Sequence, residues 1–135
     1  MTGSDKDVTA VLLREGTIGN DIAKFQQACL SNPLVSGCMV DVRRIEGRRT
    51  GEKALEVGLN AAIDLKTRML LRLKIDVTGA GKLDTQERRV EITKLTVNND
   101  VKGLIGGILG LLGYGVGKTV KVARRDVAIL ERELN

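Results

Sequence analysis

The stretch Lys53–Val77, with the sequence KALEVGLNAAIDLKTRMLLRLKIDV, decides the fold of this chain. Apolar side chains occupy every second position over Leu55–Leu65, and the same alternation resumes over Met69–Val77. Most of the intervening positions are polar or charged. Because successive side chains of a strand point to opposite faces, the stretch predicts two long strands with one apolar and one polar face. We expect Asp64–Thr67 to join them into an antiparallel hairpin.

Elements before this hairpin can cover part of its apolar face. Helical spacing predicts an amphipathic helix over Asp21–Leu30, which Asn32-Pro33 ends. A strand is expected over Cys38–Arg43 and an exposed basic turn over Glu46–Gly51. The short apolar run Val8–Leu13 fits either a strand or the start of a helix.

The chain after the hairpin continues the sheet. A glycine-rich turn is expected over Thr78–Asp84, followed by a strand over Arg88–Val97. The apolar positions of that strand change parity between Ile92 and Leu95, which indicates a β-bulge and a bent sheet. Alternation returns in two short runs, which predict one bulged strand or two short ones: Thr119–Val122 and Val127–Leu130.

A second helix is predicted from about Val101, with Asn98–Asp100 as its cap. It is apolar and rich in glycine, and each glycine costs about 0.5 to 1 kcal/mol relative to alanine. Close packing on another backbone, a cavity beside the helix and shallow insertion into a membrane interface are the three interpretations left open. The glycines are Gly103, Gly106, Gly107, Gly110 and Gly113.

Together these elements predict an α+β fold in which a long curved antiparallel sheet wraps around one or two helices. A length of 135 residues with 42% hydrophobic and 29% charged residues suits one globular domain over residues 1–135. The polar residues 1–7 are expected to be disordered. Phe25 and Tyr114 are the only aromatic residues, so the interior must be built from aliphatic side chains.

The chain is basic, with a net charge of +5 and a pI near 9.5. Arginines occur in pairs, as in Arg43-Arg44 and Arg124-Arg125. These pairs fit either a solvated surface or a surface that binds anionic head groups or phosphates. The lack of aromatic stacking platforms disfavours nucleic acid, although binding to the phosphates of a duplex needs none.

No catalytic, metal or cofactor site is predicted. The chain has no histidine, and the two thiols of Cys29 and Cys38 form either a disulfide or a buried reduced pair. Gly113–Thr119 ends like a phosphate-binding loop, but it lacks the required first glycine and the strand before it. We therefore expect a protein that is not an enzyme.

The order helix, strand, long hairpin, strand, apolar helix and final strand resembles the tubular lipid-binding superfamily, which includes bactericidal permeability-increasing protein and small bacterial envelope lipoproteins. The resemblance is a pattern of elements that covers most of the chain. It implies a curved sheet around a helix and a groove for acyl chains. The matching segments are Asp21–Leu30, Met39–Arg43, Leu55–Val77, Val90–Val97, the helix from Val101, and Val127–Leu130.

We therefore expect binding of a lipid or other apolar ligand in a groove between the sheet and the glycine-rich helix. The expected lining is Leu59, Ile63, Met69, Leu71, Leu73, Leu104, Ile108 and Leu111. The residues expected to receive an anionic head group are Arg43, Arg44, Arg124 and Arg125. The apolar residues would equally form the core of a protein without ligand. The alternatives are a structural protein that forms a homo-oligomer through its sheet, and binding to nucleic-acid phosphates.

The start of the chain does not resemble a secretion signal, and no run of about 18 apolar residues occurs. The expected location is the cell envelope or periplasm if a signal has been removed, and otherwise the cytoplasm. Contact with a membrane surface remains open as a further partner interaction.

Overall fold

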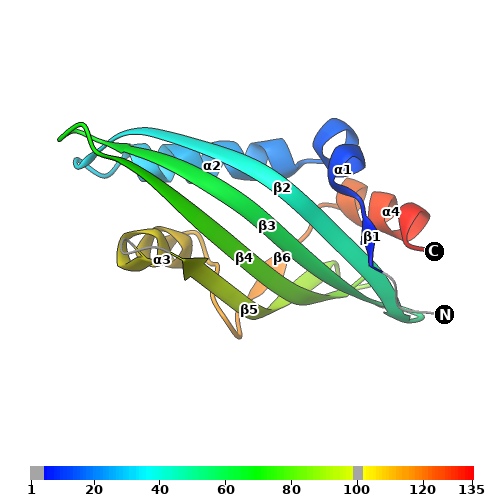
Figure 1. Cartoon of the computed structure of the whole chain (residues 1–135). Helices are drawn as coiled ribbons and strands as arrows, with labels where there is room; N and C mark the ends of the chain where they lie inside the picture. Colours follow the sequence, from blue (N-terminus) through cyan, green and yellow to red (C-terminus); the bar gives the residue numbers. More distant parts are fainter. Residues whose placement is uncertain (1–4, 99–101) are drawn as a thin grey trace.

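The computed structural model describes residues 5–98 and 102–135, with side chains from Ile105 onward in the second range. Within these ranges, six antiparallel strands lie in chain order across one open sheet and four helices accompany them, so the predicted α+β class is confirmed (Figure 1). The strands are β1 Lys6–Asp7, β2 Val35–Gly51, β3 Ala54–Thr67, β4 Arg72–Asp84, β5 Arg89–Asn98 and β6 Thr119–Lys121. The helices are α1 Thr9–Glu15, α2 Ile18–Leu30, α3 Lys102–Leu111 and α4 Arg124–Glu133.

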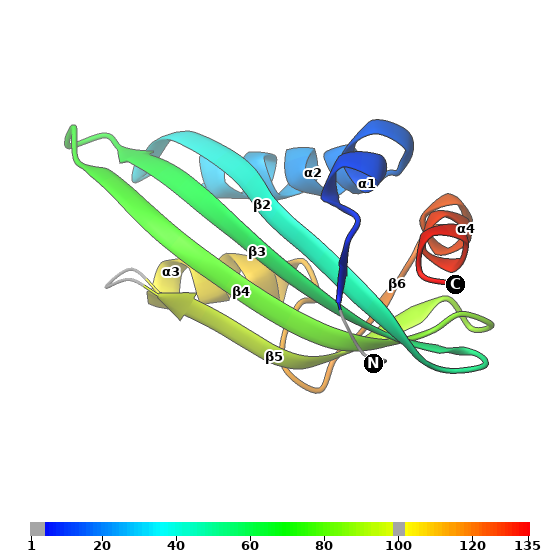
Figure 2. The ribbon, with the colours of Figure 1, turned by 45° about the vertical axis from the view of Figure 1, so that its right-hand side comes forward.

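The helices pack on the apolar face of the sheet, which the alternating residues of β3 define. Leu55 at one end of β3 and Leu65 at the other are both buried on this face. Around Leu65, side chains from α2 and α3 form one apolar cluster, while α1 and α4 form a second cluster around Leu55. Helices α2 and α3 lie along one part of the twisted sheet, and α1 and α4 lie toward its other end (Figure 2). The other face of the sheet carries the charged residues of the alternating pattern.

The turn between β3 and β4 lies four residues later than predicted. Asp64–Thr67 belong to β3, and Arg68–Leu71 form the turn. The prediction was wrong because the Thr67 N–H donates to the Leu71 carbonyl at 2.9 Å, so pairing persists to the end of Thr67. The burial of Leu65 also extends the apolar face into the segment that we expected to turn.

Two other predicted turns are also parts of strands. Glu46–Gly51 completes β2, where Arg48 faces Glu56 of β3. Thr78–Asp84 completes β4, and its glycines serve a bulge: Ala80 pairs with Lys94 and Gly81 with Ile92, which leaves Thr93 unpaired. This bulge confirms the parity shift predicted in β5. A Cβ on Gly81 would lie 2.5 Å from Val90 Cγ1, so the glycine is required by packing and not by a turn.

The ends of the chain differ most from the predictions. Val127–Leu130 lie in helix α4 instead of a strand, because the helical form buries Ile129 and Leu130 in the cluster around Leu55. Of the run Val8–Leu13, Val8 immediately precedes helix α1 and the rest lies in it, which settles the open choice between strand and helix. The predicted disorder fails for Lys6 and Asp7, which pair with β2, while residues 1–4 lie outside the described part.

Candidate functional site

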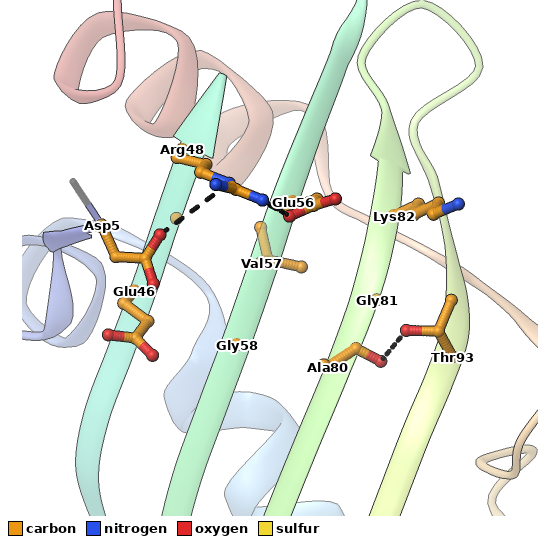
Figure 3. Close-up of a pocket in the computed structure, with 11 residues that line it drawn as sticks. Asp5, Glu46, Arg48, Glu56, Val57, Gly58, Ala80, Gly81, Lys82 and Thr93 are labelled. Atoms are coloured by element: carbon orange, nitrogen blue, oxygen red, sulfur yellow. Dashed lines mark hydrogen bonds and ion pairs between the residues drawn. The ribbon is translucent and has the colours of Figure 1, made fainter. Parts of the chain in front are cut away.

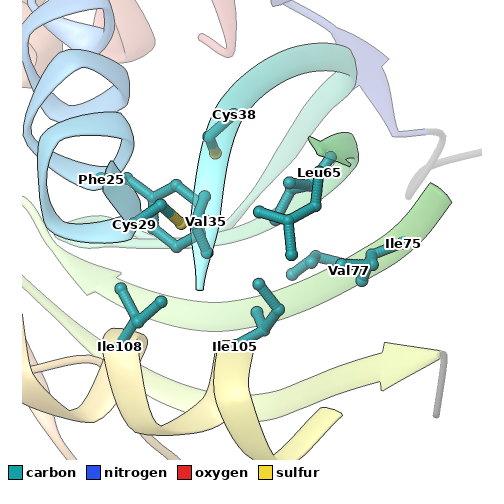
Figure 4. Close-up of a cluster of buried hydrophobic side chains, with 10 residues drawn as sticks. Phe25, Cys29, Val35, Cys38, Leu65, Ile75, Val77, Ile105 and Ile108 are labelled. Atoms are coloured by element: carbon teal, nitrogen blue, oxygen red, sulfur yellow. The ribbon is translucent and has the colours of Figure 1, made fainter. Parts of the chain in front are cut away.

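An apolar layer fills the space between the sheet and helices α2 and α3 (Figure 4). Ile105 and Ile108 point from α3 into this layer, and Ile105 is 0% exposed. Of the predicted groove residues, Ile63 and Ile108 are buried in the layer and Leu73 packs against it. The buried members are Phe25, Cys29, Val35, Cys38, Ile63, Leu65, Ile75, Val77, Ile105 and Ile108.

The remaining predicted groove residues lie elsewhere. Leu59 packs against the cluster under α1 and α4. Met69 and Leu71 are 79% and 59% exposed because they sit in the turn between β3 and β4, and Leu111 is 87% exposed at the end of α3. The structure therefore does not bring these four residues to the space between α3 and the sheet. The side chain of Leu104 lies outside the described part.

Three glycines of α3, at positions where side-chain surroundings are described, face away from the sheet. A Cβ on Gly106, Gly107 or Gly110 would meet no neighbouring atom within 4 Å. For these three glycines, the structure contradicts both close approach to another backbone and the lining of a cavity. These glycines lower the helix propensity of α3. The helix is therefore held in place by the burial of Ile105 and Ile108.

The arginines expected to bind a head group do not share one rim. Arg43 and Arg44 lie on the polar face of the sheet, where they pair with Asp76 at 3.2 Å and Glu46 at 2.9 Å. Arg124 and Arg125 begin helix α4, beside the other apolar cluster. The expected head-group site is therefore split between two places, neither of them at the layer under α3. The β-bulge at Arg43 and the helical fold of α4 account for the difference.

A hollow of about 400 Å³ lies on the polar face of the sheet (Figure 3). Small residues such as Gly58 and Ala80 make its floor. Arg48 crosses it, with Nη2 at 2.6 Å from Glu56 and Nε at 4.0 Å from Asp5. Because these exposed ion pairs already satisfy the charges around Arg48, the hollow does not present a concentrated charge to a ligand.

The two thiols lie together in the apolar layer. A hydrogen bond with Cys38 and burial raise the pKa of Cys29 above its ordinary value of 9.0, so this thiol stays protonated near neutral pH. Both cysteines are free and buried. In the described ranges, no group of three or more acidic or cysteine side chains is arranged to hold a metal ion.

Sequence reasoning missed a group of exposed apolar side chains at one end of the molecule. Leu34, in the loop between α2 and β2, lies beside the turn that contains Leu70. The run Met69-Leu70-Leu71 carried a signal, since three consecutive apolar residues break the alternation of the hairpin. We interpreted Met69 and Leu71 as strand residues and therefore placed them on the apolar face.

Comparison with models of known protein families, with curated proteins and with solved structures gives no match. No helix in the described ranges combines the length and the apolar character needed to cross a membrane.

Proposed function

We propose that this protein binds a lipid or other apolar ligand, without catalysis, between α3 and the apolar face of the sheet. The observation that carries this proposal is the contrast between the two sides of α3. Its inner side closes the apolar layer with Ile105 and Ile108, while Gly106, Gly107 and Gly110 face open space. Such a helix depends on burial for its stability and can exchange its contacts for those of an alkyl chain.

The free energy gained by burying the inner side of α3 and the free-energy cost of its glycines are of similar size. Burying one isoleucine side chain contributes about 1.5 to 3 kcal/mol. Three glycines lower the stability of the helical form by about 0.5 to 1 kcal/mol each. The net free energy that holds α3 on the sheet is therefore modest, and local opening is accessible. An open α3 exposes Ile63, Leu65 and Ile75, which an acyl chain can cover.

The composition of the layer favours an aliphatic ligand. Phe25 is its only aromatic member among the described residues, and the rest of the buried layer is aliphatic or sulfur-containing. Aliphatic side chains adapt to a flexible chain more readily than to a flat ring system. A long curved sheet wrapped around α2 and α3, as in the tubular lipid-binding superfamily, is part of this proposal.

The first test is native mass spectrometry of freshly purified protein, followed by organic extraction and mass analysis of what is released. We expect a fatty acid or phospholipid bound at about one per chain, with affinity that persists at high salt because apolar burial is not screened. A ligand-free mass that stays unchanged after incubation with fatty acid would contradict the proposal.

The second test changes the stability of α3. Replacing Gly106, Gly107 and Gly110 together with alanine stabilises the closed helix, since each added Cβ meets open space. Uptake of a fluorescent fatty acid should slow by about tenfold or more if α3 must open. Gly19→Ala is the matched control, because Gly19 lies in α2 and its Cβ also meets no atom within 4 Å. Equal uptake rates in the two variants would refute an opening helix.

A homo-oligomer is the second candidate, and the edge of β2 favours it. In the described part of the chain, β1 pairs only with Glu46 and Gly47, so most of this 17-residue strand has one side without a partner strand. An open edge of this kind can pair with another chain. The bulge and the two charges at Arg43-Arg44 oppose such pairing, which is why we rank it second. A molecular mass that rises with concentration in light scattering would support it.

A further inference from the structure

Four exposed apolar side chains form a projecting apolar tip, defined here as Leu34, Met69, Leu70 and Leu71. Leu34 is 65% exposed and Leu70 is 79% exposed. They come from the α2–β2 loop and the β3–β4 turn, which lie at the same end of the molecule (Figure 1). The Arg68 N–H donates to the Leu34 carbonyl at 3.0 Å and joins the two segments. The apolar tip is therefore one surface.

The backbone of the turn holds these side chains in place. The Thr67 N–H donates to the Leu71 carbonyl at 2.9 Å, and the Leu70 N–H donates to the Thr67 carbonyl at 3.0 Å. Leu70 has a φ of 65°, in the left-handed region that favours glycine or asparagine. A polar residue there would suit both the backbone and the solvent better than leucine does. An exposed leucine in a strained conformation therefore points to a function for its side chain.

Cationic side chains flank the apolar tip. Lys66, Arg68 and Arg72 are exposed, and none of them forms an ion pair with another residue in the described ranges. Asp64 is the carboxylate on the same stretch of the hairpin. Apolar side chains at the end of a projection with cations behind them match the layers of an anionic membrane, where head groups lie outside the acyl chains.

We propose that the apolar tip docks on the surface of an anionic membrane. Leu34, Met69, Leu70 and Leu71 enter the boundary between head groups and acyl chains, and Arg68 and Arg72 bind lipid phosphates. This inference goes beyond the proposed function and does not depend on a ligand under α3. A stable protein interface takes roughly 20 to 30 residues from each partner, whereas the apolar tip offers four apolar side chains.

Co-sedimentation with vesicles tests the docking. One set of vesicles contains phosphatidylcholine alone, and the other contains phosphatidylserine as about one third of its lipid. We expect binding to the anionic vesicles, weaker binding to the neutral ones, and weakening with added salt because phosphate contacts are screened. Equal binding to both kinds of vesicle, or no binding to either, would overturn the proposal.

Substitutions locate the contact without unfolding the protein. Leu70→Asn suits the left-handed backbone and removes the apolar side chain, so it should lower vesicle binding by about tenfold while the melting temperature holds or rises. Val116→Asn is the matched control, because Val116 is also exposed but lies outside the tip. Equal binding by wild type and Leu70→Asn would refute the role of the tip.

The cations are tested in the same way. Arg68→Gln combined with Arg72→Gln should lower binding to anionic vesicles by about tenfold at low salt. The control pair Lys94→Gln and Lys118→Gln removes the same charge from exposed positions away from the tip, and it should retain most of the binding. Equal losses in the two pairs would show that net charge, and not the apolar tip, drives the association.

A fluorescent reporter gives a direct reading of insertion. The chain has no tryptophan, so Met69→Trp introduces a single indole at the apolar tip. Its emission should shift to the blue with anionic vesicles, whereas Val116→Trp should show no shift.

A molecular mass that rises with protein concentration, and that Leu70→Asn makes constant, would instead assign the tip to contact between copies of the chain. Uptake of a soluble fatty acid does not involve the tip, so loss of vesicle binding with intact uptake separates this inference from the proposed function.

Discussion

Asp126 in α4 accepts two hydrogen bonds from Thr17, one to Oδ1 from the backbone N–H at 2.8 Å and one to Oδ2 from the hydroxyl at 2.6 Å. Thr17 immediately precedes α2, so the carboxylate satisfies a donor at the start of that helix. The contact joins residues 109 positions apart in the sequence. It fixes α4 against the junction of α1 and α2 and links the two ends of the chain.

Replacing Asp126 should therefore lower stability. We expect Asp126→Ala to reduce the free energy of unfolding by about 1 to 2 kcal/mol, because it leaves the Thr17 donors without their acceptor. Urea denaturation followed by circular dichroism measures the change. Asp41→Ala is the control, since Asp41 is exposed on β2, and its effect should stay within about 0.5 kcal/mol. Similar values for the two variants would contradict the capping role.

Glycine to alanine substitutions should have opposite signs in two helical regions. Gly106→Ala in α3 should stabilise the protein by about 0.5 to 1 kcal/mol, because its Cβ enters open space. Gly16→Ala should destabilise it, because the Cβ would lie 2.6 Å from both Asp126 Oδ1 and the Leu12 carbonyl oxygen. Thermal unfolding of both variants compares them directly. A lower melting temperature for Gly106→Ala would show that the outer side of α3 is covered.

The left-handed residue in the β3–β4 turn gives a third prediction. Leu70→Gly removes the conflict between Cβ and backbone at a φ of 65°, and it should raise stability by up to about 1 kcal/mol. Leu71→Gly offers no such relief, because Leu71 does not have a positive φ, and it should lower stability. Differential scanning calorimetry of both variants would reveal the contrast, and equal shifts would argue against strain at Leu70.

The cluster under α1 and α4 should be sensitive to truncation. Leu55 is 0% exposed and pairs across the sheet with buried Leu83. Leu55→Ala should cost about 2 to 5 kcal/mol through lost burial and the cavity it leaves. Leu13→Ala is the control, because Leu13 is largely exposed on α1 and should lose much less. A loss below about 1 kcal/mol for Leu55→Ala would mean that the core can collapse around it.

Stability should fall at alkaline pH. Burial and the charge of Asp21 raise the pKa of Tyr114 above its ordinary value of 10.0. The unfolded chain loses this proton at the ordinary pKa, whereas the folded protein retains it to higher pH. Stability is therefore fully present below about pH 9 and declines as pH rises through about 10, with a slope reduced by the partial exposure of the phenol to solvent.

Urea titrations between about pH 8 and pH 11 measure this decline. Tyr114→Phe should make the slope shallower above about pH 10, because it removes the phenol whose pKa is raised. A profile that stays flat through this range in the wild type would show that folding does not protect the Tyr114 phenol.

The polar and apolar faces of the hairpin followed directly from the sequence. Alternation over Leu55–Leu65 predicted which side chains of β3 are buried, and the glycine-rich helix and the bulge in β5 were also predicted. These features depend on local periodicity, which a strand or helix shows whatever it packs against. The position of the turn did not follow, because Met69 and Leu71 keep the parity of the apolar face although Leu70 breaks the alternation, so we interpreted Arg68–Leu71 as strand.

Candidate site residues were predicted less well than elements. Ile63, Leu73 and Ile108 belong to the layer under α3, but the turn carried Met69 and Leu71 away from it. Arg43 and Arg124 share a charge and yet lie on different faces of the molecule. A sequence pattern assigns a side chain to one face of its own helix or strand. Which residues from other elements that side chain contacts depends on how the elements pack.

The sequence by itself determined that the chain makes a two-faced antiparallel sheet, because a period of two leaves one apolar face that must be covered. Only the tertiary structure decided what covers it and what remains outside. Val127–Leu130 became helix because Ile129 and Leu130 are buried in the cluster around Leu55, and Met69-Leu70-Leu71 became an exposed tip because hydrogen bonds close the turn around them. Both outcomes depend on contacts between distant residues, which no local period encodes.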